Sequence, residues 1–238
     1  MMLEVDALSV SAKGKRILGG VSFSMKRGEC LGIVGTMGSG KTTLLYAIKG
    51  IIPGLKPGKV GGAIRFMGGE RLPMDKRIGI VFQNPNDQVF CSTLAEEVGF
   101  GLKNLGIRGN ELETRVDGAL RRVGLEGRAK DDPFELSQGQ RQKLAIASVL
   151  AMEPELLLLD EPTSSLDHRA SLEIYDILRG LSLEGKSMIV VEHQTEYLVR
   201  LGGKYLVLNE GKQVAYGGKE IFKLGKVAEC GVKIPCSR

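Results

Sequence analysis

Short apolar runs that end abruptly at polar residues are the main pattern along this chain. Nearly every side chain in them is Leu, Ile, Val or another apolar residue, which predicts strands buried on both faces, as in a parallel sheet covered by helices. Five such runs occupy residues 30–34, 78–82, 156–159, 188–191 and 205–208. The first 28 residues and residues 59–70 alternate more loosely and are rich in glycine, which favours a small antiparallel layer.

The long segment between the second and third runs, residues 84–153, has helical rather than strand character. Helices are expected in it at residues 95–102, 111–123 and 138–152, with glycines as the breaks between them. An inserted helical subdomain explains how one α/β domain reaches this length. We therefore expect a domain over residues 1–222, with a core lobe at 1–83 and 154–222 and the helical subdomain at 84–153. A hairpin is expected at 209–216, and the pattern of the C-terminal tail, 223–238, indicates no element.

Composition narrows the class of protein. The chain has 238 residues and 42% of them are apolar, which is enough to bury a core at this length. No apolar run approaches the roughly 18 residues that a membrane-spanning helix needs. The acidic start lacks the basic residues and apolar stretch of a secretory signal. The four cysteines are scattered and match no zinc spacing, so reduced thiols in a cytosol are expected.

A complete phosphate-binding loop, the Walker A pattern G-x-x-x-x-G-K-[ST], directly follows the first run. Glycines let the backbone wrap close to phosphate oxygens, and successive N–H groups at a helix start form an anion-binding nest. Lys41 would bring positive charge to the outer phosphates, and the Thr42 hydroxyl would bind Mg²⁺. The loop predicts a nucleoside-triphosphate site. Its residues are Gly35, Thr36, Met37, Gly38, Ser39, Gly40, Lys41 and Thr42, followed by Thr43.

Polar side chains also follow three further runs where each one ends. Gln83 follows the second run, Asp160 and Glu161 follow the third, and His193 comes just after the fourth. Ligands of open α/β sheets bind at the carboxyl ends of parallel strands, so we expect these groups to gather at the phosphate-binding loop. An acid after a Leu run is the Walker B pattern, in which Asp160 holds Mg²⁺, through water, and Glu161 orients or deprotonates the attacking water. The other histidine, His168, is interpreted as structural.

The segment Leu-Ser-Gln-Gly-Gln at 136–140 precedes the last helix of the predicted subdomain. Ser137 and Gln140 form a capping-box pattern, and a capped helix start beside Gly139 is also an anion site. Here the sequence resembles the ATP-binding cassette (ABC) ATPases, whose signature is Leu-Ser-Gly-Gly-Gln. The family's order of motifs is reproduced over about residues 3–222: Walker A, a Gln loop at Gln83, the signature, Walker B, a D-loop at 165–167 and a switch histidine at His193.

The resemblance implies a P-loop NTPase core with a mainly parallel sheet, a small antiparallel β layer and an inserted helical subdomain. It also implies a dimer, either of two copies or of this chain with a second ABC ATPase, in which two ATP molecules lie between head-to-tail subunits. Each ATP would lie between the Walker A loop of one subunit and the signature of the other. ATP and Mg²⁺ are the cofactors that the resemblance implies.

Roles for individual residues follow from the same resemblance. Glu161 would be the general base, and His193 would position the water and the γ-phosphate. Gln83 would bind and sense Mg²⁺. The signature residues would contact the ATP held by the other subunit. They are Ser137, Gly139 and Gln140.

A narrower resemblance lies at residues 83–101. The sequence Gln-Asn-Pro-Asn-Asp-Gln-Val-Phe, followed by Thr-Leu-Ala-Glu-Glu-Val-Gly-Phe-Gly at 93–101, is similar to the energy-coupling-factor and cobalt/nickel-importer ATPases. In those importers the stretch lines a groove for a coupling helix of a membrane-embedded subunit. Val89, Phe90 and Phe100 suit such a contact, although core packing explains them equally well. The resemblance implies a motor subunit, peripheral at the cytoplasmic face of the cell membrane, that couples ATP-driven dimer closure to uptake of a vitamin or metal ion.

Five positions depart from the family pattern. Two of them, Ser165 and His168, stand where small residues and Pro are frequent, and little effect is expected from them. Ala12 stands where most members have an aromatic residue that stacks on adenine, so a preference for ATP over GTP rests on the resemblance alone. Gln138 replaces one of the two glycines of the signature, whereas Gly139 keeps the other, and Gln194 replaces the common Asp after the switch histidine. None of these changes removes a residue expected to act in hydrolysis, and an active ATPase is expected.

Two other functions stay open. A soluble ABC ATPase acting on nucleic acid, ribosomes or cofactor assembly gains some support from the net charge of +5. However, the basic residues are dispersed, and 5% aromatic residues without Trp disfavour a base-stacking surface, so nucleic acid is not expected as a partner. A regulatory module that only binds ATP is disfavoured because Glu161 is present.

Overall fold

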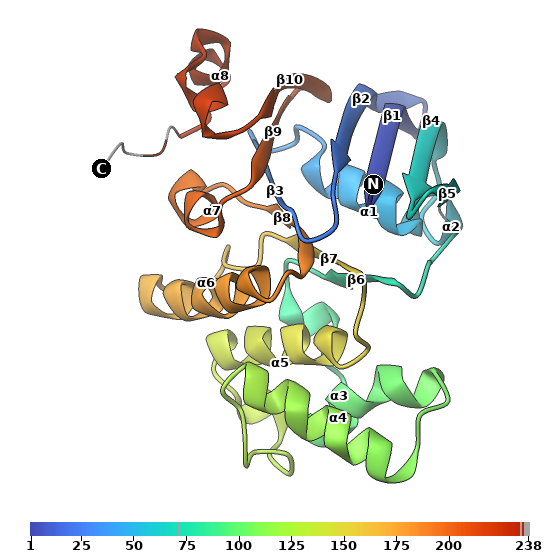
Figure 1. Cartoon of the computed structure of the whole chain (residues 1–238), viewed down its shortest axis with the longest axis vertical. Coiled ribbons are helices and arrows are strands. Elements are labelled where there is room, and N and C mark those ends of the chain that lie inside the picture. The colour runs from blue at the N-terminus through green and yellow to red at the C-terminus, as the bar shows by residue number, and fades with distance from the viewer. Residues whose placement is uncertain (71, 234, 236–238) are drawn as a thin grey trace.

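Two β-sheets and the helices around them make up the structure, a computed structural model that describes residues 1–70, 72–233 and 235 (Figure 1). The strands are β1 (Leu3–Ala12), β2 (Lys15–Met25), β3 (Cys30–Gly35), β4 (Lys59–Phe66), β5 (Gly69–Glu70), β6 (Ile78–Val81), β7 (Leu156–Asp160), β8 (Ser187–Val191), β9 (Lys204–Asn209) and β10 (Lys212–Gly217). The helices are α1 (Lys41–Lys49), α2 (Ile51–Gly54), α3 (Leu94–Asn104), α4 (Gly109–Arg122), α5 (Gln138–Leu150), α6 (His168–Leu183), α7 (Thr195–Leu201) and α8 (Gly225–Glu229).

The larger sheet has the strand order β10-β9-β3-β8-β7-β6. Its strands run parallel to one another except β10, which forms the predicted hairpin with β9. All residues of β3, β6, β7 and β8 are buried, because helices or the second sheet cover both faces. Each of the five predicted runs is a strand of this sheet, with its ends within one residue of the prediction. The mixed α/β architecture with a mainly parallel sheet is therefore confirmed.

The smaller sheet is antiparallel, with the order β2-β1-β4-β5, and it confirms the predicted β layer. Helix α1 lies between the two sheets (Figure 1). Its Leu44, Leu45 and Ile48 are fully buried and share one apolar cluster with side chains of both sheets. This packing fixes the start of α1, and with it the phosphate-binding loop, against the end of β3.

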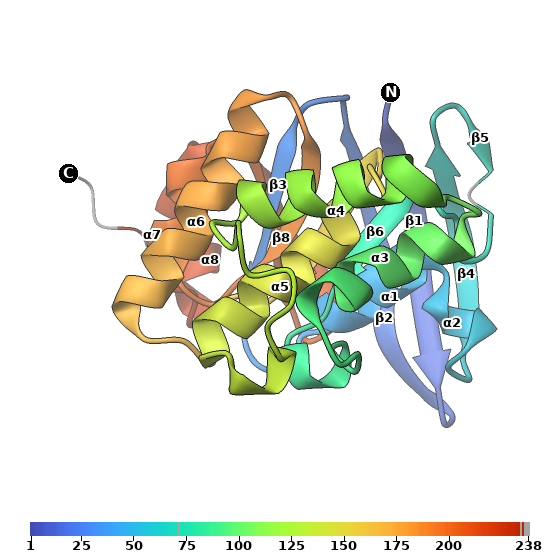
Figure 2. The same ribbon diagram turned by 90° about the horizontal axis from the view of Figure 1, so that it is seen from below.

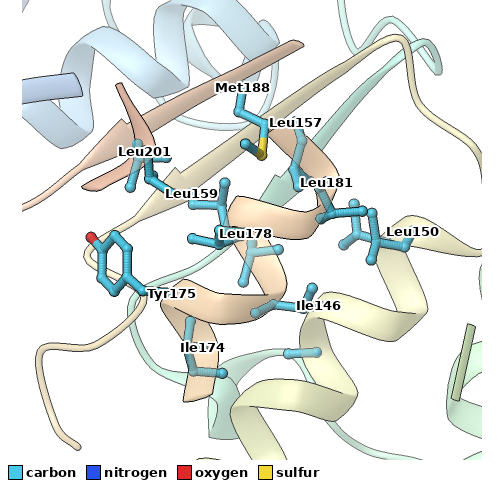
Figure 3. Packing of buried hydrophobic residues seen from close by; sticks show 14 of the residues in the cluster. Ile146, Leu150, Leu157, Leu159, Ile174, Tyr175, Leu178, Leu181, Met188 and Leu201 are labelled. Atoms are coloured by element: carbon cyan, nitrogen blue, oxygen red, sulfur yellow. The ribbon is translucent and has the colours of Figure 1, made fainter. Parts of the chain in front are cut away.

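The helices α3, α4 and α5 leave the parallel sheet after β6 and return to it at β7, and they lie side by side in Figure 2. Their apolar side chains join those of α6 and the sheet in one cluster. In Figure 3, Ile146 and Leu150 of α5 face the α6 residues Leu178 and Leu181. Helices α3, α4 and α5 are therefore inserted between β6 and β7, with a core continuous with that of the sheet, and the subdomain bounds of 84–153 stay a prediction.

Four helices, α2, α6, α7 and α8, are findings that the sequence pattern did not indicate. The crossovers into β8 and β9 contain α6 and α7, which return the chain to the start of the next parallel strand. In the C-terminal tail, α8 packs against the domain through Val227, which is fully buried. None of the helices in the described part of the chain has the length and apolar character that crossing a bilayer requires.

Candidate functional site: a phosphate-binding cavity at the strand ends

A cavity of about 470 Å³ opens at the carboxyl ends of the parallel strands. The strand order places β3, β8, β7 and β6 next to one another, so the polar residues that follow them meet at this edge. The predicted site residues that line it are Met37, Gly38, Ser39, Gly40, Lys41, Thr42, Thr43, Gln83, Glu161 and His193, and Ile17 of β2 completes the wall.

The loop between β3 and α1 has the close backbone approach that the glycines predict. A Cβ atom on Gly35 would lie 2.2 Å from the carbonyl oxygen of Leu208, so no side chain fits there. Gly40 is left-handed at φ 96° and forms the N-cap of α1, where no side chain caps the first N–H groups. Those groups therefore remain available to an anion, which the positive end of the helix dipole also favours.

Lys41 folds back over this loop. Its ammonium donates hydrogen bonds to the carbonyl oxygens of Gly35 and Thr36, both at 3.0 Å. Burial lowers the pKa of Lys41, and the nearby Glu161 and Asp160 carboxylates oppose this shift. A buried cation whose hydrogen bonds go to backbone carbonyls of the loop can turn to phosphate oxygens without a large rearrangement.

Thr42 and Asp160 supply the oxygen atoms for a cation. The Thr42 hydroxyl donates to Oδ1 of Asp160 at 3.1 Å, and the Asp160 side chain is only 1% exposed. Burial raises the pKa of Asp160 to about 6, and the charge of Glu161 adds to this increase. A hydroxyl beside a carboxylate is the donor set that Mg²⁺ prefers, and a bound cation would relieve the cost of burying the carboxylate. These two residues fit a magnesium ion beside the phosphates.

The Glu161 carboxylate contacts three other predicted site residues. Its Oε1 lies 2.8 Å from Nε2 of His193, and its Oε2 accepts a hydrogen bond of 2.8 Å from the Gln83 amide. The Lys41 ammonium lies 3.9 Å from the same carboxylate. Gln83 therefore bonds to Glu161, whereas Thr42 bonds to Asp160. The role of Gln83 as a Mg²⁺ ligand stays a prediction.

The backbone of Glu161 is left-handed, with φ 45°. Such a conformation costs a non-glycine residue about 1–3 kcal/mol, and the surrounding structure must hold it. The N–H of Glu161 donates to the carbonyl oxygen of Val191 at 3.0 Å, which ties this residue to the neighbouring strand β8. The strained turn aims the carboxylate toward His193 rather than along the strand.

The signature residues lie apart from the cavity, at the N-terminus of α5. The Ser137 hydroxyl accepts from the Gln140 N–H at 3.3 Å, and the Gln140 side chain accepts from the Ser137 N–H at 3.0 Å, so the predicted capping box is present. Ser137 is exposed, and Gly139 follows it in the first turn of the helix. Within one chain, the structure does not bring these residues to the phosphate-binding loop.

Other residues near the site give no signal in the sequence. Ile17 comes from β2 of the antiparallel sheet, and Asn209, at the end of β9, accepts a hydrogen bond from the Thr36 hydroxyl at 3.2 Å. Ala12 ends β1 and is half-buried. His168 stacks on Tyr197, with its Nδ1 2.9 Å from the tyrosine hydroxyl, in agreement with a structural histidine.

The pKa of Asp160 predicts how cation binding depends on pH. Protonation of this carboxyl removes its charge, so we expect the affinity for Mg²⁺ with ATP to fall by up to about tenfold per pH unit below about pH 6. Titration of Mg²⁺ with a fluorescent ATP analogue between pH 5 and 7.5 measures this. Because the nucleotide phosphates titrate in the same range, Asp160→Asn is the control, and its affinity should fall less steeply. Equal slopes for the two proteins would contradict the role of Asp160.

The chain is similar to a described family and to several known proteins. The family described as ABC transporter matches residues 18–164. An energy-coupling factor transporter ATP-binding protein, EcfA, from Methanothermobacter thermautotrophicus is 39% identical over 93% of this chain and 73% of its own length. EcfA from Methanococcus maripaludis is 40% identical over 88% of this chain and 76% of its own length.

Two solved structures share the fold over most of the chain. One is cbiO1 from Clostridium perfringens, described as part of the ABC transporter complex cbiONQ, with a TM-score of 0.84 and 33% identity over 96% of this chain and 93% of that one. The other is a dimeric, post-hydrolysis state of the ATP-binding cassette MJ0796 bound to ADP and Pi, with a TM-score of 0.76 and 28% identity over 91% and 98% of the two chains.

Proposed function

Because the chain belongs to the ABC transporter family as an ATP-hydrolysing subunit, we propose that it is the motor of an importer that takes up a vitamin or a metal ion. In this proposal, two ATPase subunits close around ATP and pull on a membrane-embedded partner, and hydrolysis reopens them. The chain would then be peripheral at the cytoplasmic face of the cell membrane. The names of its relatives support import, since the matched EcfA proteins are energy-coupling factor subunits and cbiO1 is part of cbiONQ.

The hydrolytic step can be assigned to residues around the cavity. The loop N–H groups and Lys41 would bind the β- and γ-phosphates, and Glu161 would accept the proton of the water that attacks the γ-phosphate. His193, within hydrogen-bond reach of Glu161, would hold that water and the γ-phosphate in place. Mg²⁺, held by Thr42 and Asp160, would neutralise charge on the phosphate oxygens. The separation of the signature from the cavity supports a site completed by a second subunit.

An exposed aromatic pair carries the importer proposal. Phe90 is 59% and Phe100 46% exposed, and their rings pack edge to face with centroids 4.9 Å apart. The backbone N–H of Phe90 donates to the buried Glu97 at 2.9 Å, which holds the loop on α3. Val89 is buried in the core, so only the two aromatic residues face outward.

A second cavity of about 460 Å³ is lined by the loop that begins at Gln83, up to Asp87, which lies three residues before Phe90. Its apolar walls include Tyr46, Leu55 and Phe82. Its polar lining includes Gln83 and Asp87, and it reaches Thr42 and Asp160 at the proposed cation site. A hollow with apolar walls in the same loop that carries an exposed aromatic residue suits an amphipathic helix laid into a groove. Because Gln83 also bonds to Glu161, a helix seated there would lie one hydrogen bond from the catalytic carboxylate.

Phe90→Asp tests the docking role. A charge on this surface would have to be desolvated on contact with an apolar helix, so we expect co-purification with the membrane subunit to fall at least about tenfold, while ATP affinity stays unchanged. Leu183→Asp is the matched control, because Leu183 is 81% exposed at the far end of α6. Affinity purification from native membranes identifies the partner. Equal recovery of the partner by Phe90→Asp and the control would weigh against this surface.

The alternative is a soluble ABC ATPase that acts on nucleic acid, ribosomes or cofactor assembly. It predicts binding to DNA or RNA that weakens steeply with salt. The importer proposal instead predicts that a co-expressed membrane protein stimulates ATP hydrolysis. Both measurements on the same preparation separate the two functions.

A further inference from the structure

Glu192 is a buried carboxylate that the proposed hydrolytic step does not use. It directly follows β8 and precedes His193, and it is only 1% exposed. Burial raises its pKa, and the charge of Glu161 acts in the same direction, whereas hydrogen bonds from Thr163 and from the backbone of His193 and Gln194 oppose the shift. Burying a carboxylate costs free energy, so a buried carboxylate beside the site suggests a specific role for Glu192.

The two oxygens of Glu192 join two loops. Oε1 accepts a hydrogen bond from the hydroxyl of Thr163, which is 2% exposed and lies two residues after Glu161. Oε2 accepts a hydrogen bond of 2.9 Å from the backbone N–H of His193. One side chain therefore connects the loop that follows β7 to the loop that follows β8.

Together with backbone hydrogen bonds, these contacts fix the two loops that carry Glu161 and His193. On the backbone side, the Glu161 N–H bonds to Val191 in β8, and the N–H of Glu192 bonds to Ile33 in β3 at 3.1 Å. On the other side, Glu192 holds both Thr163 and the His193 N–H. The His193 side chain is 40% exposed, so its direction depends on the backbone that Glu192 holds.

We propose that Glu192 is a positioning residue that, through Thr163 and the His193 backbone, holds His193 against Glu161 in the geometry needed for hydrolysis. The inference rests on the roles proposed above for Glu161 and His193. Other groups that face Glu192 are Lys41 across the cavity and Tyr175 of α6, each of which feels its charge. The Glu192 carboxylate itself does not contact the reacting atoms and acts through the backbone of the switch loop.

Two nearly isosteric substitutions test the proposal. Glu192→Gln replaces one accepting oxygen by an amide, and Thr163→Val removes the hydroxyl that Glu192 binds. We expect each to lower kcat by about ten- to hundredfold, because misplacing a catalytic group by about 1 Å costs that much. The KM for ATP should change less than about threefold, since the phosphate contacts stay intact. Thr163→Ser, which keeps the hydroxyl, should recover most of the activity.

A double-mutant cycle separates positioning from a general structural defect. If Glu192 acts through His193, then Glu192→Gln should lower kcat no further in a His193→Ala background. Thermal unfolding of every variant shows whether it is folded, and the Thr163→Val and Thr163→Ser pair decides the question if Glu192→Gln does not fold. Wild-type kcat for Glu192→Gln or Thr163→Val, or losses that multiply with His193→Ala, would overturn the proposal.

The same measurements distinguish this inference from the roles on which it rests. Full activity of His193→Ala would refute the role of His193 in hydrolysis, and with it the positioning role of Glu192. Inactive His193→Ala together with fully active Glu192→Gln would refute Glu192 alone. Neither result bears on the membrane partner, which the Phe90 experiment tests separately.

Discussion

Replacing Glu161 with Gln is expected to lower ATP hydrolysis by about 10²–10⁴-fold, the range that a general base contributes. The amide cannot accept the proton of the attacking water, yet it can still bond to Gln83 and His193, so ATP should bind as before. Phosphate release at saturating ATP and Mg²⁺ measures the loss. Glu113→Gln, on the exposed surface of α4, is the matched control and should keep wild-type activity.

The same variant tests the two-subunit site. Since ATP would hold the subunits together and hydrolysis would release them, Glu161→Gln with ATP should run as a dimer in size-exclusion chromatography, whereas the wild-type protein after turnover should not. A persistent monomer at saturating ATP would weigh against a shared site. Undiminished hydrolysis by Glu161→Gln would instead contradict the assignment of the base.

Lys41→Ala should weaken ATP binding about hundredfold or more. Hydrogen bonds to charged groups contribute about 1.5–3 kcal/mol each, and two lost bonds to phosphate oxygens amount to about 3 kcal/mol or more, which is roughly a factor of a hundred in affinity. The replacement also removes the bonds to the carbonyl oxygens of Gly35 and Thr36, so the loop loses its internal tie as well.

Ligand-induced stabilisation measures this effect directly. Saturating ATP with Mg²⁺ should raise the Tm of the wild-type protein by mass action and leave the Tm of Lys41→Ala nearly unchanged. Lys76→Ala, an exposed lysine in the loop before β6, is the control for removing a positive charge. An equal rise in Tm for Lys41→Ala would show that nucleotide binds elsewhere than at this loop.

The strands and the polar residues after them could be predicted because both signals are local. A run such as 156–159 is apolar on both faces only when a parallel strand is covered on both sides, and an acid at its end stands out. The helices α3 to α5 were predictable from their length and glycine breaks. For the same reason, the sequence alone predicts that the phosphate-binding loop, Glu161 and His193 lie at the carboxyl ends of the parallel strands.

What the sequence does not reveal depends on contacts between distant segments. Ile17 reaches the cavity only because β2 packs over α1, and the pairing of Thr163 with Glu192 follows from the adjacency of β7 and β8. Helix α6 is amphipathic, with apolar residues at helical spacing on its buried face. Because charged residues separate them along the chain, they form no continuous apolar run that would have indicated the helix. The bond between Gln83 and Glu161 likewise joins the ends of two strands.

The attachment of the helical insertion has a mechanical consequence. In the described part of the chain, β6 is the edge strand of its sheet and β7 is its neighbour. The insertion is therefore joined to the sheet by two adjacent chain segments at this edge. Its helix α5 packs through Ile146 and Leu150 on α6, so a tilt of the insertion would shift this aliphatic contact and leave the ladders between β7, β8, β3 and β9 intact. Gln83 lies in the segment that leaves β6, and its amide donates a hydrogen bond to Glu161. A tilt of the insertion would therefore reach the nucleotide site through the Gln83 side chain.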